Sequence, residues 1–285
     1  MSERCSELSL AAGESLAATA TTAESWLLVE VSGPWPRDVA SEGALPETAR
    51  RAVSAWLSET PRSRLQFVRR PGRTGHRSVA FVVRAEEGAA EARRLELDGH
   101  EDLAAVDFDR DGDPVDGSLV LVCGHGSRDA CCALRGTAVF GALAPRLAEE
   151  ELWISSHQGG HRFAANILAL PAGLQFGRVE PGEAPFVVAR ALAGRIELGR
   201  YRGRTCYEPA VQAAERAVRE AAELDRVADL RLVGVHGSVV SFRARDGTEY
   251  AADVKEIEGP AIPASCGALA EVQKAFRARI VLDVK

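Results

Sequence analysis

The chain has no long apolar run, few lysines and no basic cluster, and these features argue against particular classes of protein. No stretch of its 285 residues approaches the roughly 18 consecutive apolar residues that a membrane-spanning helix needs. It has only three lysines and a formal net charge of −6, and no basic cluster lies beside aromatic residues. Neither nucleic acid nor a membrane is therefore expected as a partner. The strong bias from lysine to arginine is interpreted as the mark of a GC-rich bacterial genome.

The N-terminus also lacks the features of a targeting segment. Its first 25 residues contain one arginine, several glutamates and no hydrophobic core segment, so neither a secretory signal nor a transit peptide is expected. We therefore expect a cytoplasmic location, where thiols stay reduced. The six cysteines are then better interpreted as ligands, redox groups or small buried side chains than as three disulfides.

The spacing of apolar residues predicts an α/β fold in which one order of elements occurs twice. A strand–helix–strand unit followed by a β-hairpin and a closing helix is the order of a thioredoxin-like fold. The two halves are interpreted as a degenerate tandem of such units, followed by a small C-terminal α+β domain. The predicted helices cover residues 46–60, 129–148, 184–198 and 209–224, and the predicted strands cover residues 26–31, 64–70, 78–85, 92–98, 118–123, 151–156, 162–170 and 174–180, with short strands within 235–254.

Three units are expected along the chain. Residues 1–110 form an N-terminal α/β unit, residues 111–200 a thioredoxin-like ferredoxin unit, and residues 201–285 a small accessory domain. The acidic stretch 107–117 has too few apolar residues for a helix or strand and is interpreted as an exposed connector. It weakly resembles a calcium loop, but the glutamate that should close such a loop is missing.

The stretch CGHGSRDACC joins the end of a buried strand to the start of a helix. Cys123 ends the strand, Asp129 is placed as the helix N-cap, and Cys131 and Cys132 fall in the first turn, where the helix dipole favours a thiolate. Neighbouring helix positions diverge by about 100°, so Cys131 and Cys132 cannot easily both face Cys123. One is expected to bind a metal and the other to pack, and the residues alone leave the choice open.

A second cluster, HQGGH, follows the next strand. Its two glycines favour a tight loop, so His157 and His161 can converge on one point. Both clusters are expected near the same end of the sheet. Together, two thiolates and two imidazoles make a complete set of metal ligands.

Neighbouring residues are expected to support the site. His125, Gly126 and Arg128 would lie around the ligands, with His125 and Arg128 orienting them by hydrogen bonds. Whichever of Cys131 and Cys132 is not a ligand would pack beside them. The other cysteines are interpreted as small buried side chains: Cys5, Cys206 and Cys266.

The sequence resembles the sucrase/ferredoxin-like family, which consists of thioredoxin-like ferredoxins with a [2Fe–2S] cluster on two cysteines and two histidines. The resemblance implies Cys123, Cys132, His157 and His161 as the ligands, so it selects Cys132 and leaves Cys131 beside the site. The motifs that carry it are CGHGSRD with a cysteine nine positions after the first, HxGGH, and, along most of the chain, RC, GE, WLLVE, GPW, YRGR and AVQAAERAVRE.

The resemblance implies an electron-transfer protein with one [2Fe–2S] cluster rather than an enzyme with its own substrate. A reductase as donor and an unidentified acceptor are then the expected partners. One alternative is a structural zinc site that makes the chain a binding module, but zinc sites usually space paired cysteines two to four residues apart. The other is a thiol oxidoreductase that uses Cys131 or Cys132, although no C-x-x-C motif is present.

Overall fold

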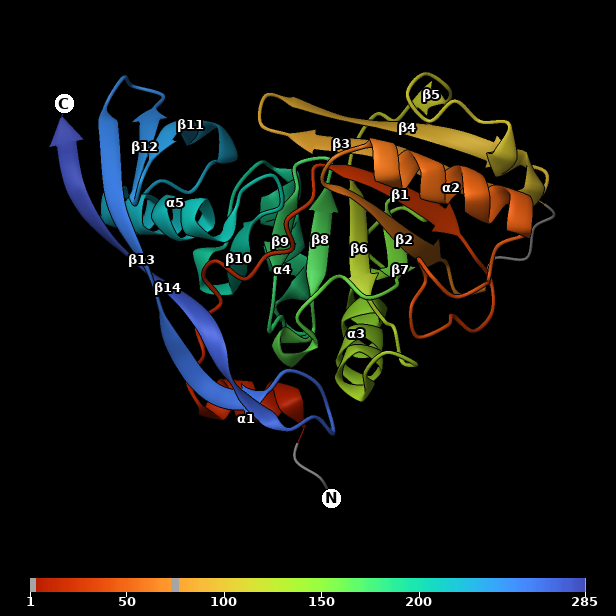
Figure 1. Ribbon diagram of the computed structural model, residues 1–285, viewed down its shortest axis with the longest axis horizontal. Helices are drawn as coiled ribbons and strands as arrows, with labels where there is room; N and C mark the ends of the chain where they lie inside the picture. Colours follow the sequence, from red (N-terminus) through yellow and green to blue (C-terminus); the bar gives the residue numbers. More distant parts are fainter. Residues whose placement is uncertain (1–3, 73–76, 285) are drawn as a thin grey trace.

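The computed structural model describes residues 4–72 and 77–284 and confirms an α/β fold (Figure 1). A ten-stranded sheet has the order β10-β9-β8-β6-β7-β2-β1-β3-β4-β5, and a four-stranded sheet has the order β11-β12-β13-β14. The helices are α1 (Cys5–Ala11), α2 (Glu47–Glu59), α3 (Ala130–Leu143), α4 (Ala184–Leu192) and α5 (Pro209–Ala222), with short 3-10 helices η1 (His100–Ala104), η2 (His161–Phe163), η3 (Leu198–Arg200) and η4 (Val227–Asp229). The strands are β1 (Ser25–Glu30), β2 (Ser63–Arg69), β3 (Ser78–Glu86), β4 (Ala89–Leu97), β5 (Asp113–Pro114), β6 (Leu119–Cys123), β7 (Leu152–Ser155), β8 (Ile167–Leu170), β9 (Leu174–Phe176), β10 (Tyr201–Arg204), β11 (Leu230–His236), β12 (Val239–Ala244), β13 (Glu249–Pro263) and β14 (Ala270–Val284).

Each half of the large sheet has the same four-stranded arrangement. In the first half, β1 pairs in parallel with β2 and antiparallel with β3, and β3 pairs with β4. In the second half, β6 pairs in parallel with β7 and antiparallel with β8, and β8 pairs with β9. The antiparallel pair β2–β7 joins the two halves. A repeated strand–helix–strand unit with a hairpin is the order that the sequence analysis expects, and its assignment as thioredoxin-like stays a prediction.

The large sheet extends across the expected boundary between residues 110 and 111. Strands from both sides of that boundary hydrogen-bond into one sheet, and β10 from the expected accessory domain adds its outer edge. Helix α5 packs on the four-stranded sheet, with Val218 and Phe242 in a shared core cluster. The predicted units 1–110, 111–200 and 201–285 therefore do not correspond to separate sheets. Whether they are separate domains stays a prediction.

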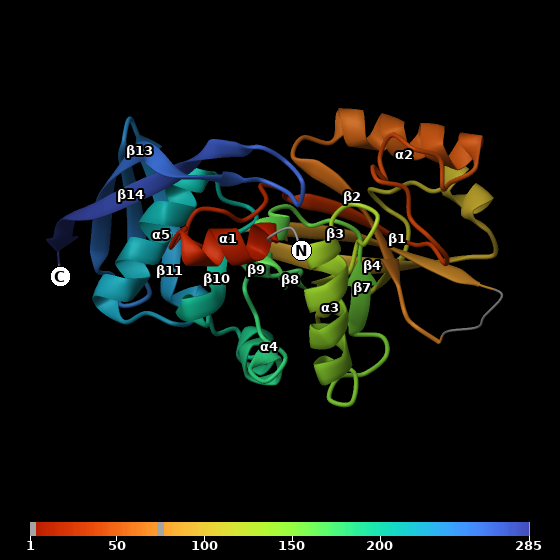
Figure 2. The same ribbon diagram turned by 90° about the horizontal axis from the view of Figure 1, so that it is seen from below.

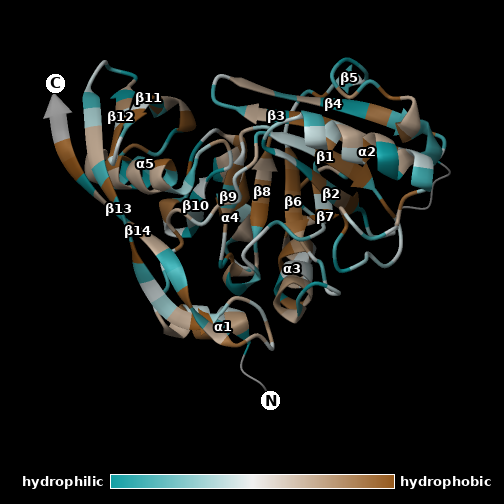
Figure 3. Ribbon diagram, in the orientation of Figure 1, coloured by the Kyte–Doolittle hydropathy of each residue, from teal (hydrophilic) through white to brown (hydrophobic). Residues whose placement is uncertain are grey.

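The central strands are buried on both faces because alternate side chains enter different cores. Leu27 of β1 packs into the cluster beneath α2, whereas Trp26 packs into a cluster on the opposite face. Val122 and Leu121 of β6 divide between two clusters in the same way. Hydrophobic residues accordingly concentrate in the large sheet (Figure 3). In the described ranges, no helix is both long enough and apolar enough to cross a membrane.

Several element boundaries differ from the predicted ones. The strand expected at 162–170 starts only at Ile167, because the chain first forms the 3-10 helix η2. The helix expected at 184–198 ends at Leu192, and the acidic stretch 107–117 contains the short exposed strand β5. The sequence analysis missed the long β13–β14 hairpin, which shifts register between Glu258 and Ala261 and is exposed over much of its length. Figures 1 and 2 show this hairpin running from the small sheet to α1.

Helix α3 approaches the end of β6 so closely that only glycine fits at position 136. A Cβ atom on Gly136 would lie 1.9 Å from the carbonyl oxygen of Cys123, far inside van der Waals contact. The helix begins at an N-cap, Asp129, whose side chain accepts a 2.8 Å hydrogen bond from the backbone N–H of Cys131. The cap and the close approach together place the first turns of α3 against the end of β6.

This packing predicts that Gly136→Ala destabilises the fold by about 1–3 kcal/mol, because the new methyl group must push α3 away from β6. Gly141→Ala on the same helix is the matched control: no atom lies within 4 Å of its added Cβ. Alanine there should stabilise the helix by about 0.5–1 kcal/mol. Urea unfolding of both variants measures the difference, and equal midpoints would contradict the close-packing argument.

Candidate metal centre

Three of the four predicted ligands converge at the C-terminal ends of two parallel strands. Cys123 is the last residue of β6, His157 follows β7, and Cys132 lies in the first turn of α3. One ligand atom from each of these three side chains lies within 4.8 Å of the other two. Both thiols are fully buried, at 0–1% exposure. The parallel pairing brings the two loops together as the sequence analysis expects.

The fourth predicted ligand, His161, lies beside this group. Its ring stacks on the ring of His157, with 4.5 Å between centroids and 28° between planes. In the described part of the chain, the Nδ1 atoms of both rings are buried and have no hydrogen-bond partner. An unsatisfied buried polar atom costs about 1–3 kcal/mol. Unpartnered imidazole nitrogens beside paired thiols fit a bound metal.

The charges of the site suit metal binding. The hydrogen bond from the Cys132 thiol, with one from the His157 side chain and the charge of that ring, holds the pKa of Cys123 well below its usual range despite burial. The same hydrogen bond to Cys123, together with burial, raises the pKa of Cys132. Burial and then the neighbouring His157 lower the pKa of His161 to about 4, so its imidazole is neutral near pH 7. A thiolate and neutral imidazoles are the forms that bind metal.

The backbone of His157 is held from three sides. Its N–H donates to Nδ1 of His125 at 3.1 Å, and its carbonyl accepts from Arg64 at 2.9 Å and from Gln66 at 3.1 Å. The other ring nitrogen of His125 lies 2.8 Å from the carbonyl of Pro36, which assigns the proton to Nε2. His125 therefore contacts the site through the backbone of His157.

The two glycines of the loop are required by their conformation and neighbours. Gly159 and Gly160 have φ angles of 90° and 68°, and a Cβ on Gly160 would lie 2.6 Å from Nη2 of Arg202. Buried Arg202 donates to the carbonyl of Gly159 at 2.9 Å and to the side chain of Asn166 at 2.8 Å. Asn166 in turn donates to the carbonyl of Gly160 at 3.0 Å. Arg202 and Asn166 were not predicted as loop supports; the sequence offered only the YRGR motif, which contains Arg202 but does not reveal its burial.

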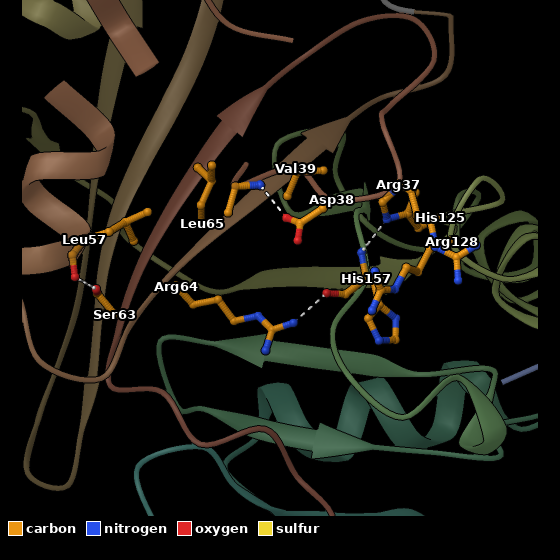
Figure 4. A pocket seen from close by; sticks show the side chains of 11 residues that line it. Arg37, Asp38, Val39, Leu57, Ser63, Arg64, Leu65, His125, Arg128 and His157 are labelled. Atoms are coloured by element: carbon orange, nitrogen blue, oxygen red, sulfur yellow. Dashed lines mark hydrogen bonds between the residues drawn. The ribbon is translucent and has the colours of Figure 1, made fainter. Parts of the chain in front are cut away.

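A cavity of about 310 Å³ opens onto His157 (Figure 4). Arg37, Arg64 and Arg128 line it together with one carboxylate, that of Asp38, so positive charge exceeds negative charge in its wall. Arg128 lies in the wall of this cavity, and its predicted role of orienting the ligands by hydrogen bonds stays a prediction. Gly126 packs against α3, where an added Cβ would lie 3.2 Å from that of Ala133.

Cys131 turns away from Cys132 and belongs to a second thiol cluster. Its partners are Cys5, Cys266 and the carboxylate of Asp129, with one ligand atom from each residue within 4.8 Å of the others. Hydrogen bonds from the Cys5 thiol and from Ser6 lower the pKa of Cys131 to about 5. Cys5 and Cys266, interpreted from the sequence as isolated small side chains, therefore lie in a polar cluster, whereas buried Cys206 belongs to neither group.

An α/β sheet with clustered thiols and imidazoles at its strand ends defines a protein with a candidate metal-binding site. The chain belongs to the sucrase/ferredoxin-like family, whose family model matches residues 16–203. No solved structure matches it.

Curated relatives are named Altered inheritance of mitochondria protein 32. The one from Eremothecium gossypii is 34% identical over 46% of this chain and 46% of its own length. Those from Clavispora lusitaniae and Meyerozyma guilliermondii are each 33% identical, over 32% and 30% of this chain and 37% and 34% of their own lengths. The chain thus spans less than half the length of the curated relatives it matches.

These relatives contradict two predictions. They are named for mitochondrial inheritance rather than as electron-transfer ferredoxins, so the prediction of an electron carrier is wrong. They are eukaryotic proteins, which also contradicts the bacterial assignment. The physical reason is that a ligand set limits what a site can hold but not what the protein does with it, and an arginine bias identifies no organism.

In metal-free protein, His161 should make stability depend on pH. Its folded pKa of about 4 lies below the ordinary value of 6.5, so the unfolded state takes up this proton first as pH falls. The stabilisation is complete above about pH 6.5 and is lost as pH falls through about 4, by up to roughly 3 kcal/mol. Urea unfolding of chelator-treated protein across this range measures the loss, and His161→Gln should reduce it; an unchanged slope in that variant would contradict the assignment.

Proposed function

We propose that the chain is a metal-centre protein in which Cys123, Cys132, His157 and His161 hold a [2Fe–2S] cluster. The observation that carries this proposal is the meeting of two buried thiols and one imidazole, with a second imidazole stacked on the first. Thiolates favour zinc and iron–sulfur centres, and histidine replaces cysteine as a cluster ligand in some [2Fe–2S] proteins.

The position of His161 favours two metal ions over one. In a tetrahedral zinc site, bonds of about 2.0–2.3 Å place all four ligand atoms within about 4 Å of one another. Here the ligand atoms of Cys123, Cys132 and His157 lie within 4.8 Å of one another, and His161 lies beside this group rather than in it. A dinuclear cluster distributes its ligands over two irons and accommodates this arrangement.

Charge also supports a centre with two histidines. With two neutral imidazoles, the formal charges of an oxidised cluster and its ligands sum to zero, whereas four thiolates would leave a net negative charge. A buried site disfavours net charge because low-dielectric surroundings solvate it poorly. The lowered pKa of His161 keeps that ring neutral, in the form that such a centre needs.

The proposal concerns binding of the cluster and includes no role as an electron carrier. The reductase and acceptor expected from the sequence presuppose that role and are not carried further. We keep the cytoplasmic location as part of the proposal, supported by six cysteines that are all free. The mitochondrial wording in the relatives' names makes cell fractionation its natural test.

The proposal predicts brown protein that contains two irons and two acid-labile sulfides per chain after anaerobic expression with iron supplied. Visible absorption, elemental analysis and sulfide determination on fresh full-length protein measure this. Colourless, iron-free protein under those conditions would overturn the cluster, and zinc in its place, held by the same four residues, would support a mononuclear site.

The two neighbouring cysteines should differ sharply on substitution. Cys132→Ser should remove the cluster or make it labile, because Cys132 lies beside Cys123 and His157. Cys131→Ser is the matched control and should leave the cluster absorption nearly unchanged, because Cys131 faces the second thiol cluster. The reverse result would mean that Cys131 is the ligand.

A further inference from the structure

Four chemically reactive side chains from three distant parts of the chain meet at the start of α3. Cys5 comes from α1, Asp129 and Cys131 come from the cap and first turn of α3, and Cys266 comes from the turn between β13 and β14. Figures 1 and 2 show α1 and the hairpin turn lying together beside α3. Cys5 and Cys131 also form a small buried cluster with Ala164, against which Cys266 packs, but apolar packing does not explain the carboxylate of Asp129 among the thiols.

The distances within this group are those of a single small ion's ligands. The Sγ atom of Cys5 lies 3.7 Å from that of Cys131 and 3.6 Å from that of Cys266, and the last two lie 3.4 Å apart. An Oδ1 atom of Asp129 lies 3.4 Å from Sγ of Cys266 and 3.9 Å from Sγ of Cys5. Tetrahedral ligation with Zn–S bonds of about 2.3 Å requires S···S separations of about 3.8 Å.

We propose a second metal site, distinct from the first, in which the thiolates of Cys5, Cys131 and Cys266 and the carboxylate of Asp129 bind one zinc ion. Four protein ligands close the coordination sphere, as in structural zinc sites. Three sulfurs at nearly equal separations also distinguish this site from a disulfide, which would join two of them and leave the third.

The surroundings of the site hold its ligands in place. The backbone N–H groups of Cys131 and Cys266 each donate to one oxygen of Asp129 at 2.8 Å, which fixes the carboxylate between them. Ser6 donates to Sγ of Cys131 at 3.3 Å, and Arg135 donates to Ser6 at 3.1 Å. Such outer contacts orient metal ligands and compensate their charge.

The bound ion would tie α1 and the β13–β14 hairpin to the first turn of α3. That turn also carries Cys132, so the adjacent cysteines of the CC pair serve different sites. The zinc site would thereby support the geometry of the first site without sharing a ligand with it. When the first site holds its proposed iron cluster, iron content reports the first site and zinc content reports the second.

The test measures zinc per chain in full-length protein saturated with Zn²⁺ and then freed of excess metal. Wild-type protein should retain one zinc ion, and Cys266→Ser should bind it more than about 100-fold more weakly, since outer-shell changes alone cost 10–100-fold. Two control variants should retain zinc. Cys206→Ser removes a buried thiol outside both groups, and Cys123→Ser alters only the first site.

Any of three results would overturn the second site. They are retention of zinc by Cys266→Ser, absence of zinc from wild-type protein, and loss of zinc from Cys123→Ser. If Cys266→Ser does not fold, wild-type protein still decides the matter. Zn²⁺ alone should slow alkylation of the half-buried Cys266 by at least about tenfold, because a metal-bound thiolate is a poorer nucleophile than a free one. Equal alkylation rates with and without Zn²⁺ would refute the site, whatever the iron content of the first.

Discussion

The close approach of α3 to the end of β6 is the contact on which both cysteine clusters depend. Gly136 allows the helix backbone to touch the carbonyl of Cys123, and Asp129 fixes where the helix begins. With the start and the distance of the helix both set, its first turn presents Cys132 toward Cys123 and Cys131 toward Cys5. Two adjacent residues thus reach different clusters because a helix rotates about 100° per residue.

The first half of the large sheet, β1 to β4, supports the metal centre on the second half. The first half carries no cysteine at the end of β1, where the second half has Cys123 at the end of β6. It contributes Arg64 and Gln66 of β2, which hold the carbonyl of His157 across the β2–β7 junction. The backbone after β1 also accepts hydrogen bonds from the loop that follows Cys123, with Pro36 facing His125. Because the two halves join edge to edge through β2 and β7, the loop after β1 lies against the loop that follows Cys123.

Local patterns were sufficient to predict the α/β class, most helices and strands, and loops with Cys123 and His157 at one end of the sheet, whereas the choice of Cys132 over Cys131 came from the family resemblance. These features follow from apolar periodicity and from parallel strands whose ends share one edge of a sheet. The approach of Cys5 and Cys266 was not predictable in this way, because it depends on a hairpin and a short helix packing across the whole chain. Arg202 was missed for the same reason: its role exists only once β10 lies beside the loop of Gly159.

The two clusters also show why the residues of a site do not reveal a protein's role. Each cluster brings thiols, with either imidazoles or a carboxylate, to distances that a metal ion can bridge. A metal ion that binds only the folded state would stabilise the fold by mass action. A metal at either position would therefore be consistent with a purely structural function as well as a chemical one. The two sites differ in their surroundings: the first adjoins a cavity at His157, whereas the second joins α1, the first turn of α3 and the hairpin turn, with Cys266 partly exposed. The cavity gives an outside molecule a route to His157, and the proposed second site would hold the helix on which the first site depends.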